Sequence, residues 1–97
     1  MDFKNMASRL KARYGMDFYD GYLRYALMFS EADRGKPSLQ THHVCPRCCG
    51  GKDDDFNLIR ITFEHHRTLH RLILLTESLT PEQRRHLQFA YSKMRGK

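Results

Sequence analysis

The segment 41–72 constrains this chain most, because its histidines fall at spacings suited to the binding of one metal ion. His66 and His70 are four residues apart, which places them on one face of a helix with Cβ atoms roughly 5 to 6 Å apart. Two imidazoles alone hold a metal loosely, so a third ligand has to come from another element. His42 can supply it if the chain folds back as a hairpin against that helix.

His43, which directly follows His42, is expected to have a different role. Neighbouring side chains on an extended strand point to opposite faces, so His43 need not follow His42 onto the metal. A neutral imidazole, which titrates at about pH 6.5, can take a proton from water while a metal ion stabilises charge on a phosphate. The doublet therefore offers one candidate metal ligand and one candidate general base.

The residues between the two histidine groups predict a β-hairpin. An extended stretch over 39–45 ends at Pro46, which lacks a backbone donor. Two glycines and an acidic run over 50–55 have the composition of a loop. Residues 57–61, Asn-Leu-Ile-Arg-Ile, alternate between polar and apolar side chains, as a half-buried return strand does.

Helices are expected on both sides of this hairpin. The helix after it begins at Thr62 as the cap. Four aliphatic residues should form its buried side: Leu69, Leu72, Ile73 and Leu75. A last helix begins with a capping box at Thr80 and a first-turn Pro81, and runs to about Met94.

Two further helices are expected before the hairpin. Apolar residues recur at spacings of three and four up to a helix stop at Gly15: Phe3, Met6, Leu10 and Tyr14. A second helix should begin after Asp17 and end before Gly35, and it carries an aromatic stripe: Phe18, Tyr22, Tyr25 and Phe29. Aromatic residues at helical spacing are typical of a core, and less often form a surface on which bases stack.

These motifs resemble those of the HNH endonucleases, which have the ββα-metal fold. The similarity is in particular to free-standing phage homing endonucleases, whose core reads His-His-Ile-x-Pro-Arg, then Gly-Gly, Asn-Leu, Glu-His and a last His. The matching positions here are His42-His43-Val44-Cys45-Pro46-Arg47, Gly50-Gly51, Asn57-Leu58, His65-His66 and His70. The resemblance covers about a third of the chain.

The resemblance implies a role for each of these residues. His42, His66 and His70 would bind one divalent metal ion, as in the colicin-type DNases, and His43 would act as the general base. Asn57 would be the central Asn of the family name, whose amide ties the loop to the strand and holds the base in position. The ion could be Mg²⁺, Mn²⁺, Ni²⁺ or Zn²⁺, and the sequence does not choose between them.

His65 is where the chain departs from the family pattern, which often has Glu at this position. The departure leaves open which histidine of the 65–66 pair turns inward. Helical geometry favours His66, because His65 and His70 are five residues apart and point about 140° from one another.

The three cysteines permit a second interpretation. Cys45 and Cys48 have the spacing of a zinc-binding pair, and Cys49 adds a third thiolate. There is no second cysteine pair, so a zinc knuckle would need a histidine already assigned to the nuclease centre. The simpler interpretation is that Cys45 fills a core position and the other two are reduced thiols. An odd number of cysteines in a short chain also favours a reducing compartment.

A formal net charge of +6 suits a polyanionic partner such as DNA. Arg67 and Arg71 belong to the histidine helix, and the forked guanidinium of Arg47 can bind two phosphate oxygens. We expect these three side chains to bind DNA phosphates, with an affinity that falls steeply with salt. No apolar stretch reaches the length of a membrane span and no secretory signal begins the chain, so we expect an intracellular, cytoplasmic protein.

The sequence therefore predicts one α+β domain over residues 1–97, with N-terminal helices within 1–36, a ββα-metal core over 39–78 and a C-terminal helix over 80–95. The expected function is metal-dependent hydrolysis of DNA phosphodiester bonds, by nicking or cutting of duplex DNA. Specificity is expected to be low, or to come from a homodimer or a protein partner. The alternative is a catalytically inactive HNH-fold module, of phage-like origin, that binds nucleic acid or inhibits a protein.

Overall fold

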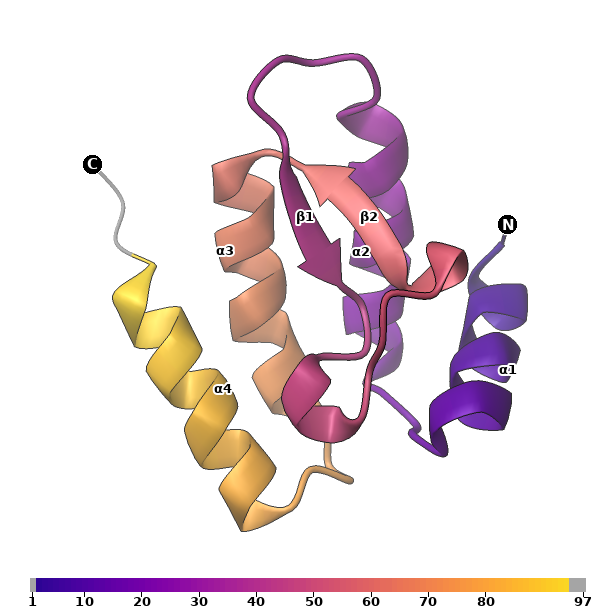
Figure 1. Ribbon diagram of the computed structural model, residues 1–97, viewed down its shortest axis with the longest axis vertical. Helices are drawn as coiled ribbons and strands as arrows, with labels where there is room; N and C mark the ends of the chain where they lie inside the picture. Colours follow the sequence, from indigo (N-terminus) through magenta and orange to yellow (C-terminus); the bar gives the residue numbers. More distant parts are fainter. Residues whose placement is uncertain (1, 95–97) are drawn as a thin grey trace.

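The computed structural model describes residues 2–94 and combines helices with one antiparallel hairpin (Figure 1). The order of elements is α1 (Phe3–Tyr14), α2 (Asp20–Ala32), β1 (Gln40–His43), β2 (Leu58–Ile61), α3 (Phe63–Leu72) and α4 (Pro81–Lys93). The predicted α+β class is confirmed. The succession of β1, β2 and α3 is consistent with the ββα-metal fold.

The two N-terminal helices pack against each other through apolar faces. α1 is capped by Asp2, whose carboxylate accepts a hydrogen bond from the Asn5 amide. The helix stops at Gly15, as predicted, and this residue is in the left-handed conformation. α2 begins at Asp20, two residues later than the start predicted directly after Asp17. The aromatic stripe is only partly a core: Tyr22 is fully buried, whereas Tyr25 is 44% exposed.

The hairpin places successive residues of β1 on opposite faces. β1 and β2 are antiparallel, with His42 opposite Ile59 and His43 opposite Leu58. Both strands are shorter than expected, because Asn57 belongs to a short 3-10 turn and the chain turns directly after His43. His42 is buried among core residues, and His43 is only half-buried.

The helix α3 lies beside the hairpin and also contacts α2 and α4 (Figure 1). Its cap is Thr62, whose hydroxyl accepts a hydrogen bond from the His65 amide, as predicted. Leu69 and Ile73 are buried, but the prediction that Leu75 is buried was wrong, since this side chain is 56% exposed. The reason is a 3-10 turn over Ile73–Leu75, whose tighter winding rotates the last residues out of the helical stripe.

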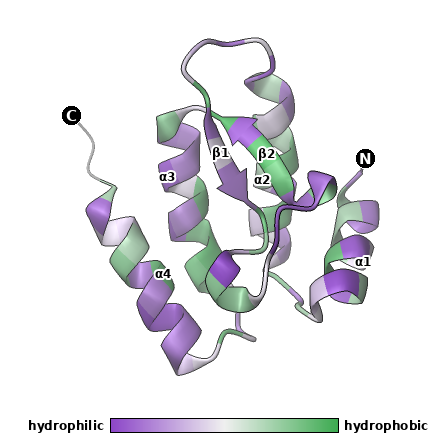
Figure 2. Ribbon diagram, in the orientation of Figure 1, coloured by the Kyte–Doolittle hydropathy of each residue, from purple (hydrophilic) through white to green (hydrophobic). Residues whose placement is uncertain are grey.

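The last helix, α4, covers the outer side of α3. It starts with the predicted capping box, in which Thr80 and Gln83 each bond the other's backbone. Figure 2 shows that α4 is mostly hydrophilic, and Leu87 is its buried residue. Over residues 2–94, none of the helices is long and apolar enough to cross a membrane.

One buried carboxylate joins the end of α2 to the start of α3. Asp33 accepts hydrogen bonds from the Thr62 amide at 2.9 Å, from His65 Nδ1 at 2.7 Å and from Lys36 Nζ at 3.1 Å. Burial alone would raise the pKa of Asp33, but these three hydrogen bonds outweigh it and lower the pKa to about 2. The charged carboxylate therefore fixes where α3 begins.

Candidate metal centre

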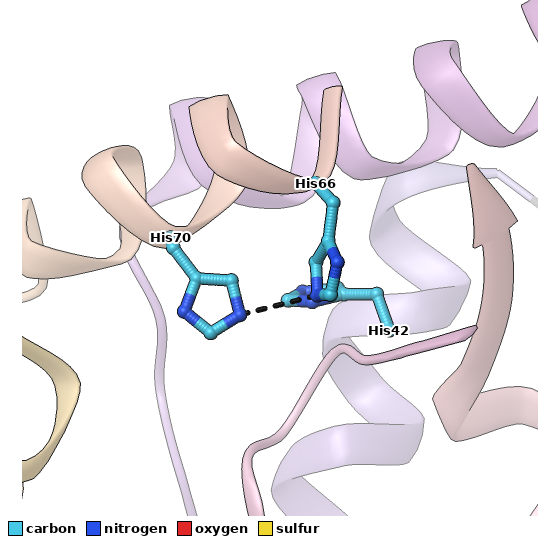
Figure 3. Close-up of side chains that lie close together, drawn as sticks. All are labelled: His42, His66 and His70. Carbon is cyan, nitrogen blue, oxygen red and sulfur yellow. Dashed lines mark hydrogen bonds between the residues drawn. The ribbon is translucent and has the colours of Figure 1, made fainter. Parts of the chain in front are cut away.

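Three histidines from two elements converge at the junction of β1 and α3 (Figure 3). One nitrogen from each of His42, His66 and His70 lies within 4.8 Å of the others. The ring centroids are 4.8 to 5.3 Å apart, and the rings meet edge to face. Three imidazole nitrogens gathered in this way are a donor set that suits a divalent ion such as zinc.

The local structure explains why these three rings meet. His66 and His70 lie one helical turn apart on the face of α3 that is turned to the hairpin, and His42 comes from the face of β1 that is turned to α3 (Figure 3). His42 is 3% exposed, whereas the α3 pair is half-buried. The cluster is thus anchored in the core on the strand side and more accessible on the helix side.

Burial keeps the three rings in their neutral form at pH 7. Burial lowers the pKa of His42 well below its usual range, and the nearby His70, His66 and His43 lower it further. Burial also lowers the pKa of His66. For His70, burial and the neighbouring His66 lower the pKa to about 4. Neutral imidazoles keep the lone pair that a metal ion needs.

The hydrogen bonds of the α3 pair leave two ring nitrogens facing each other. His66 Nδ1 lies 2.8 Å from Gln40 Oε1, and its Nε2 lies 3.2 Å from His70 Nε2. The amide oxygen of Gln40 only accepts, so His66 Nδ1 carries the proton and its Nε2 holds a lone pair. His70 Nδ1 is buried without a partner among the described residues, a cost that structures tend to tolerate at functional sites.

His65 turns away from this cluster. Its ring stacks on Phe29 of α2, with centroids 3.9 Å apart and an interplanar angle of 1°, and its Nδ1 bonds Asp33. The structure therefore brings His66, rather than His65, toward His42 and His70. His65, at the position where the family pattern often has Glu, thus contributes to the contact between α2 and α3.

The candidate base, His43, lies beside an acidic loop. Its Nε2 is 2.8 Å from Asp53 Oδ1, and Arg47 Nη2 is 3.1 Å from the same oxygen. The hydrogen bond from His43 and the charge of Arg47 lower the pKa of Asp53. His43 is half-buried, with 23% of its side chain exposed, so its ring can meet a large ligand.

Asn57 closes the hairpin loop with its side chain. Its Oδ1 accepts from the Cys45 amide at 2.7 Å, and its Nδ2 donates to the carbonyl oxygens of Cys45 and Lys52 at 3.1 and 2.9 Å. Its backbone carbonyl accepts from the Val44 amide at 2.9 Å. Fully buried, this side chain joins the loop to the residues that directly follow His43.

The three predicted phosphate-binding arginines differ in their contacts with other side chains and backbone groups. Arg47 is exposed and paired with Asp53. Arg67 donates from Nε to the Met94 carbonyl and lies over the Tyr91 ring, so it connects α3 to α4. Arg71 is exposed at the end of α3, and we find no side-chain hydrogen bond to it from other described residues.

Two of the three cysteines, Cys45 and Cys49, are buried. Burial raises the pKa of Cys45 and of Cys49 to about 12, so both are thiols at neutral pH. Cys48 is exposed, with its Sγ 4.0 Å from that of Cys49. Within residues 2–94, the thiols do not belong to a group of three metal-binding side chains, and the zinc knuckle gains no support there.

Three residues that contact the site were not identified from the sequence. Tyr22 was assigned to the core, Asp53 to a loop and Gln40 to no role. Asp53 and Gln40 lie next to the motif, and a polar side chain two residues before His42 on a strand shares its face, which is a usable signal for Gln40. Tyr22 had no such signal, because its contact depends on how α2 packs.

The chain is similar to phage mobile endonucleases. Three similar proteins of Enterobacteria phage T4 are named probable mobile endonuclease B, E and C. B is 53% identical over 34 residues, which are 35% of this chain and 13% of that protein. E is 44% identical over 34 residues, 35% of this chain and 24% of that protein. C is 39% identical over 44 residues, 45% of this chain and 21% of that protein.

These similarities are partial. The chain spans less than a quarter of the length of each of these relatives. No family model matches the chain, and no solved structure matches it. The relatives therefore associate one segment of this chain with endonucleases.

Proposed function

We propose that this protein is a metal-dependent endonuclease of the HNH type that hydrolyses phosphodiester bonds in duplex DNA. The observation that carries the proposal is the convergence of His42, His66 and His70 on one side of β1, with the ring of His43 on the other side. The names of the phage relatives support an endonuclease, and they also support a phage-encoded protein that acts in a bacterial host.

The residues present fit a divalent ion. The Nε2 atoms of His66 and His70 face each other at 3.2 Å and share one proton. If both atoms held a divalent ion, this proton would move to His70 Nδ1, which has no hydrogen-bond partner among the described residues. His42 adds a third neutral imidazole from the strand. When bound by these three side chains, a divalent ion supplies stabilisation of negative charge on the phosphate and on the leaving oxygen.

His43 is the proposed proton acceptor, and Asp53 and Asn57 orient it. His43 Nε2 donates its hydrogen to Asp53, which leaves the lone pair on Nδ1 to take a proton from the attacking water. The carboxylate of Asp53 then stabilises the imidazolium that forms. Asn57 holds the backbone after His43 and so fixes the position of this ring relative to the loop.

The arginines near the site provide charge for the DNA backbone. Arg47 shares Asp53 with His43, so a phosphate bound by its guanidinium would lie next to the proposed base. Arg71, at the end of α3, offers a guanidinium that has no side-chain hydrogen bond to residues 2–94. Arg67 is held by α4 through Nε, which leaves only its terminal nitrogens for a phosphate.

Cleavage of supercoiled plasmid tests the proposal. The assay compares Mg²⁺, Mn²⁺, Ni²⁺ and Zn²⁺ with a chelator, using the wild type and His43→Ala, with His86→Ala as a matched control. His86 is an exposed histidine of α4, remote in sequence from the motif. We expect metal-dependent nicking that His86→Ala preserves and that His43→Ala lowers by a factor of about 100 or more.

Two results would contradict the proposal in different ways. Undiminished cleavage by His43→Ala would remove His43 as the base. A wild-type protein that binds DNA but cleaves none with any of the four ions would favour the inactive module instead.

A further inference from the structure

Tyr22, a residue of α2 outside the hairpin and α3, contacts His42 of the three-histidine cluster. Its hydroxyl lies 2.7 Å from His42 Nε2 and 2.6 Å from the Val44 carbonyl oxygen. Both side chains are buried, with Tyr22 at 0% and His42 at 3% exposure. No water competes with hydrogen bonds in such an environment, so their directions are fixed by the protein.

The direction of these bonds follows from the number of protons. A tyrosine hydroxyl has one hydrogen, and a carbonyl oxygen can only accept. The hydroxyl of Tyr22 therefore donates to the Val44 carbonyl and has to accept from His42 Nε2. His42 then carries its proton on Nε2, and its lone pair is on Nδ1.

We propose that Tyr22 is a positioning residue that holds His42 in the Nε2–H tautomer, so that Nδ1 is the atom His42 offers to a metal ion. This inference rests on the proposed function, because it assumes that the cluster binds a metal. It gives the site a mixed donor set. His42 offers Nδ1, whereas His66 and His70 offer the Nε2 atoms that face each other.

The second contact of Tyr22 makes this arrangement rigid. The Val44 amide is bonded by the Asn57 carbonyl, and the Val44 carbonyl is bonded by Tyr22. The segment after the His42-His43 doublet is therefore held from the loop side and from α2. Outer contacts of this kind orient a metal-binding imidazole, and their loss typically weakens metal binding by roughly 10 to 100 times.

The tautomer of His42 can be measured on the metal-free wild-type protein. Long-range ¹H–¹⁵N NMR correlations of the histidine side chains distinguish Nε2–H from Nδ1–H rings, with His42→Gln used to assign the signal. We expect the Nε2–H pattern for His42. A ring protonated on Nδ1 would overturn the inference without any need for a variant.

Metal affinity provides the second measurement. Tyr22→Phe keeps the buried ring and removes the hydroxyl, and Tyr25→Phe is the matched control on the exposed side of the same helix. Zn²⁺ affinity is measured by competition with a chromophoric chelator, and NMR spectra report whether each variant is folded. We expect Tyr22→Phe to weaken Zn²⁺ binding roughly 10 to 100 times and to mix the His42 tautomers, and Tyr25→Phe to change neither.

Equal Zn²⁺ affinities of a folded Tyr22→Phe variant and the wild type would overturn the inference. If Tyr22→Phe does not fold, the wild-type tautomer decides alone. These measurements use no DNA, so the two proposals fail separately. If the protein shows the expected tautomer and Zn²⁺ affinity but never cleaves DNA, only the proposed nuclease function is contradicted. If it cleaves DNA but His42 has the other tautomer, only the proposed role of Tyr22 is contradicted.

Discussion

A single peptide bond separates two imidazoles with opposite surroundings. His42 is buried, neutral and bonded to a tyrosine, whereas His43 is half-buried and bonded to a carboxylate. Strand alternation alone produces this difference, because successive side chains leave a strand on opposite faces. One short motif can therefore place the proposed metal ligand and the proposed proton acceptor on opposite faces of the hairpin.

The contact between His43 and Asp53 predicts a specific loss of activity. Asp53→Asn should slow plasmid cleavage roughly 10 to 100 times, because the imidazolium loses its carboxylate, while Zn²⁺ affinity stays unchanged. Asp55→Asn, in the same acidic run and without a side-chain hydrogen bond to the described residues, is the control. A variant at Asp53 that cleaves as fast as the control would show that this carboxylate does not assist His43.

Site residues were predictable from the sequence where the chemistry is local. His66 and His70 share a helical face by spacing alone, whereas the loop role of Asn57 was implied by the resemblance to the HNH endonucleases. The Asp53 and Tyr22 contacts depend on loop conformation and on the packing of α2. No spacing rule connects Tyr22 to His42 across twenty residues.

At the scale of elements, the two glycines of the hairpin loop have different functions. A Cβ at Gly51 would overlap the carbonyl group of Cys45, whereas one at Gly50 would meet open space. Gly50 has a φ of 94°, so it tolerates alanine only with backbone strain. Position 51 requires glycine because the backbone of Cys45 packs against it, and position 50 favours glycine because of its positive φ.

This difference predicts unequal costs in stability. Gly51→Ala should lower the free energy of unfolding by about 3 kcal/mol or more, because the backbone of the loop has to move. Gly50→Ala should cost about 1 kcal/mol. Urea denaturation of the two variants makes the comparison, and equal losses would contradict the assigned overlap.

The Asp33 carboxylate predicts how acid affects the joint between α2 and α3. The pKa of Asp33 is about 2 in the folded protein and 3.8 when unperturbed, so its charge stabilises the fold above pH 3.8. That contribution is lost as the pH falls from 3.8 to about 2. Asp33→Asn should lower the free energy of unfolding at pH 7 by about 2 kcal/mol. In this variant the free energy of unfolding should also fall less than in the wild type between pH 3.8 and about 2. Glu77→Gln, at an exposed carboxylate, should do neither.

Element types could be predicted better than their ends. The caps predicted at Thr62 and Thr80 are local signals, and the structure confirms both. The exposed Leu75 was missed because a helical stripe predicts burial only while the helix keeps its pitch. The start of α2 was missed because Phe18 is buried without being helical.

For the molecule as a whole, the net charge of +6 predicts strongly salt-dependent DNA binding. If about four phosphates are neutralised, affinity should fall roughly 100 times between 50 and 200 mM salt. Arg47→Ala should reduce the slope of log K against log salt by about one, because one phosphate contact is lost. Fluorescence anisotropy with a short duplex measures both, and an unchanged slope would exclude Arg47 from the phosphate contacts.

The N-terminal helices are connected to the centre by more than apolar packing. Tyr22 of α2 contacts His42 of β1. Asp33, the residue that directly follows α2, accepts a hydrogen bond from the cap of α3. A graft of residues 39–78 into a foreign scaffold would carry every histidine of the motif and still lose the Tyr22 hydroxyl that contacts His42 and the Asp33 carboxylate that contacts His65. Any attempt to transplant this centre should therefore begin upstream, at α2.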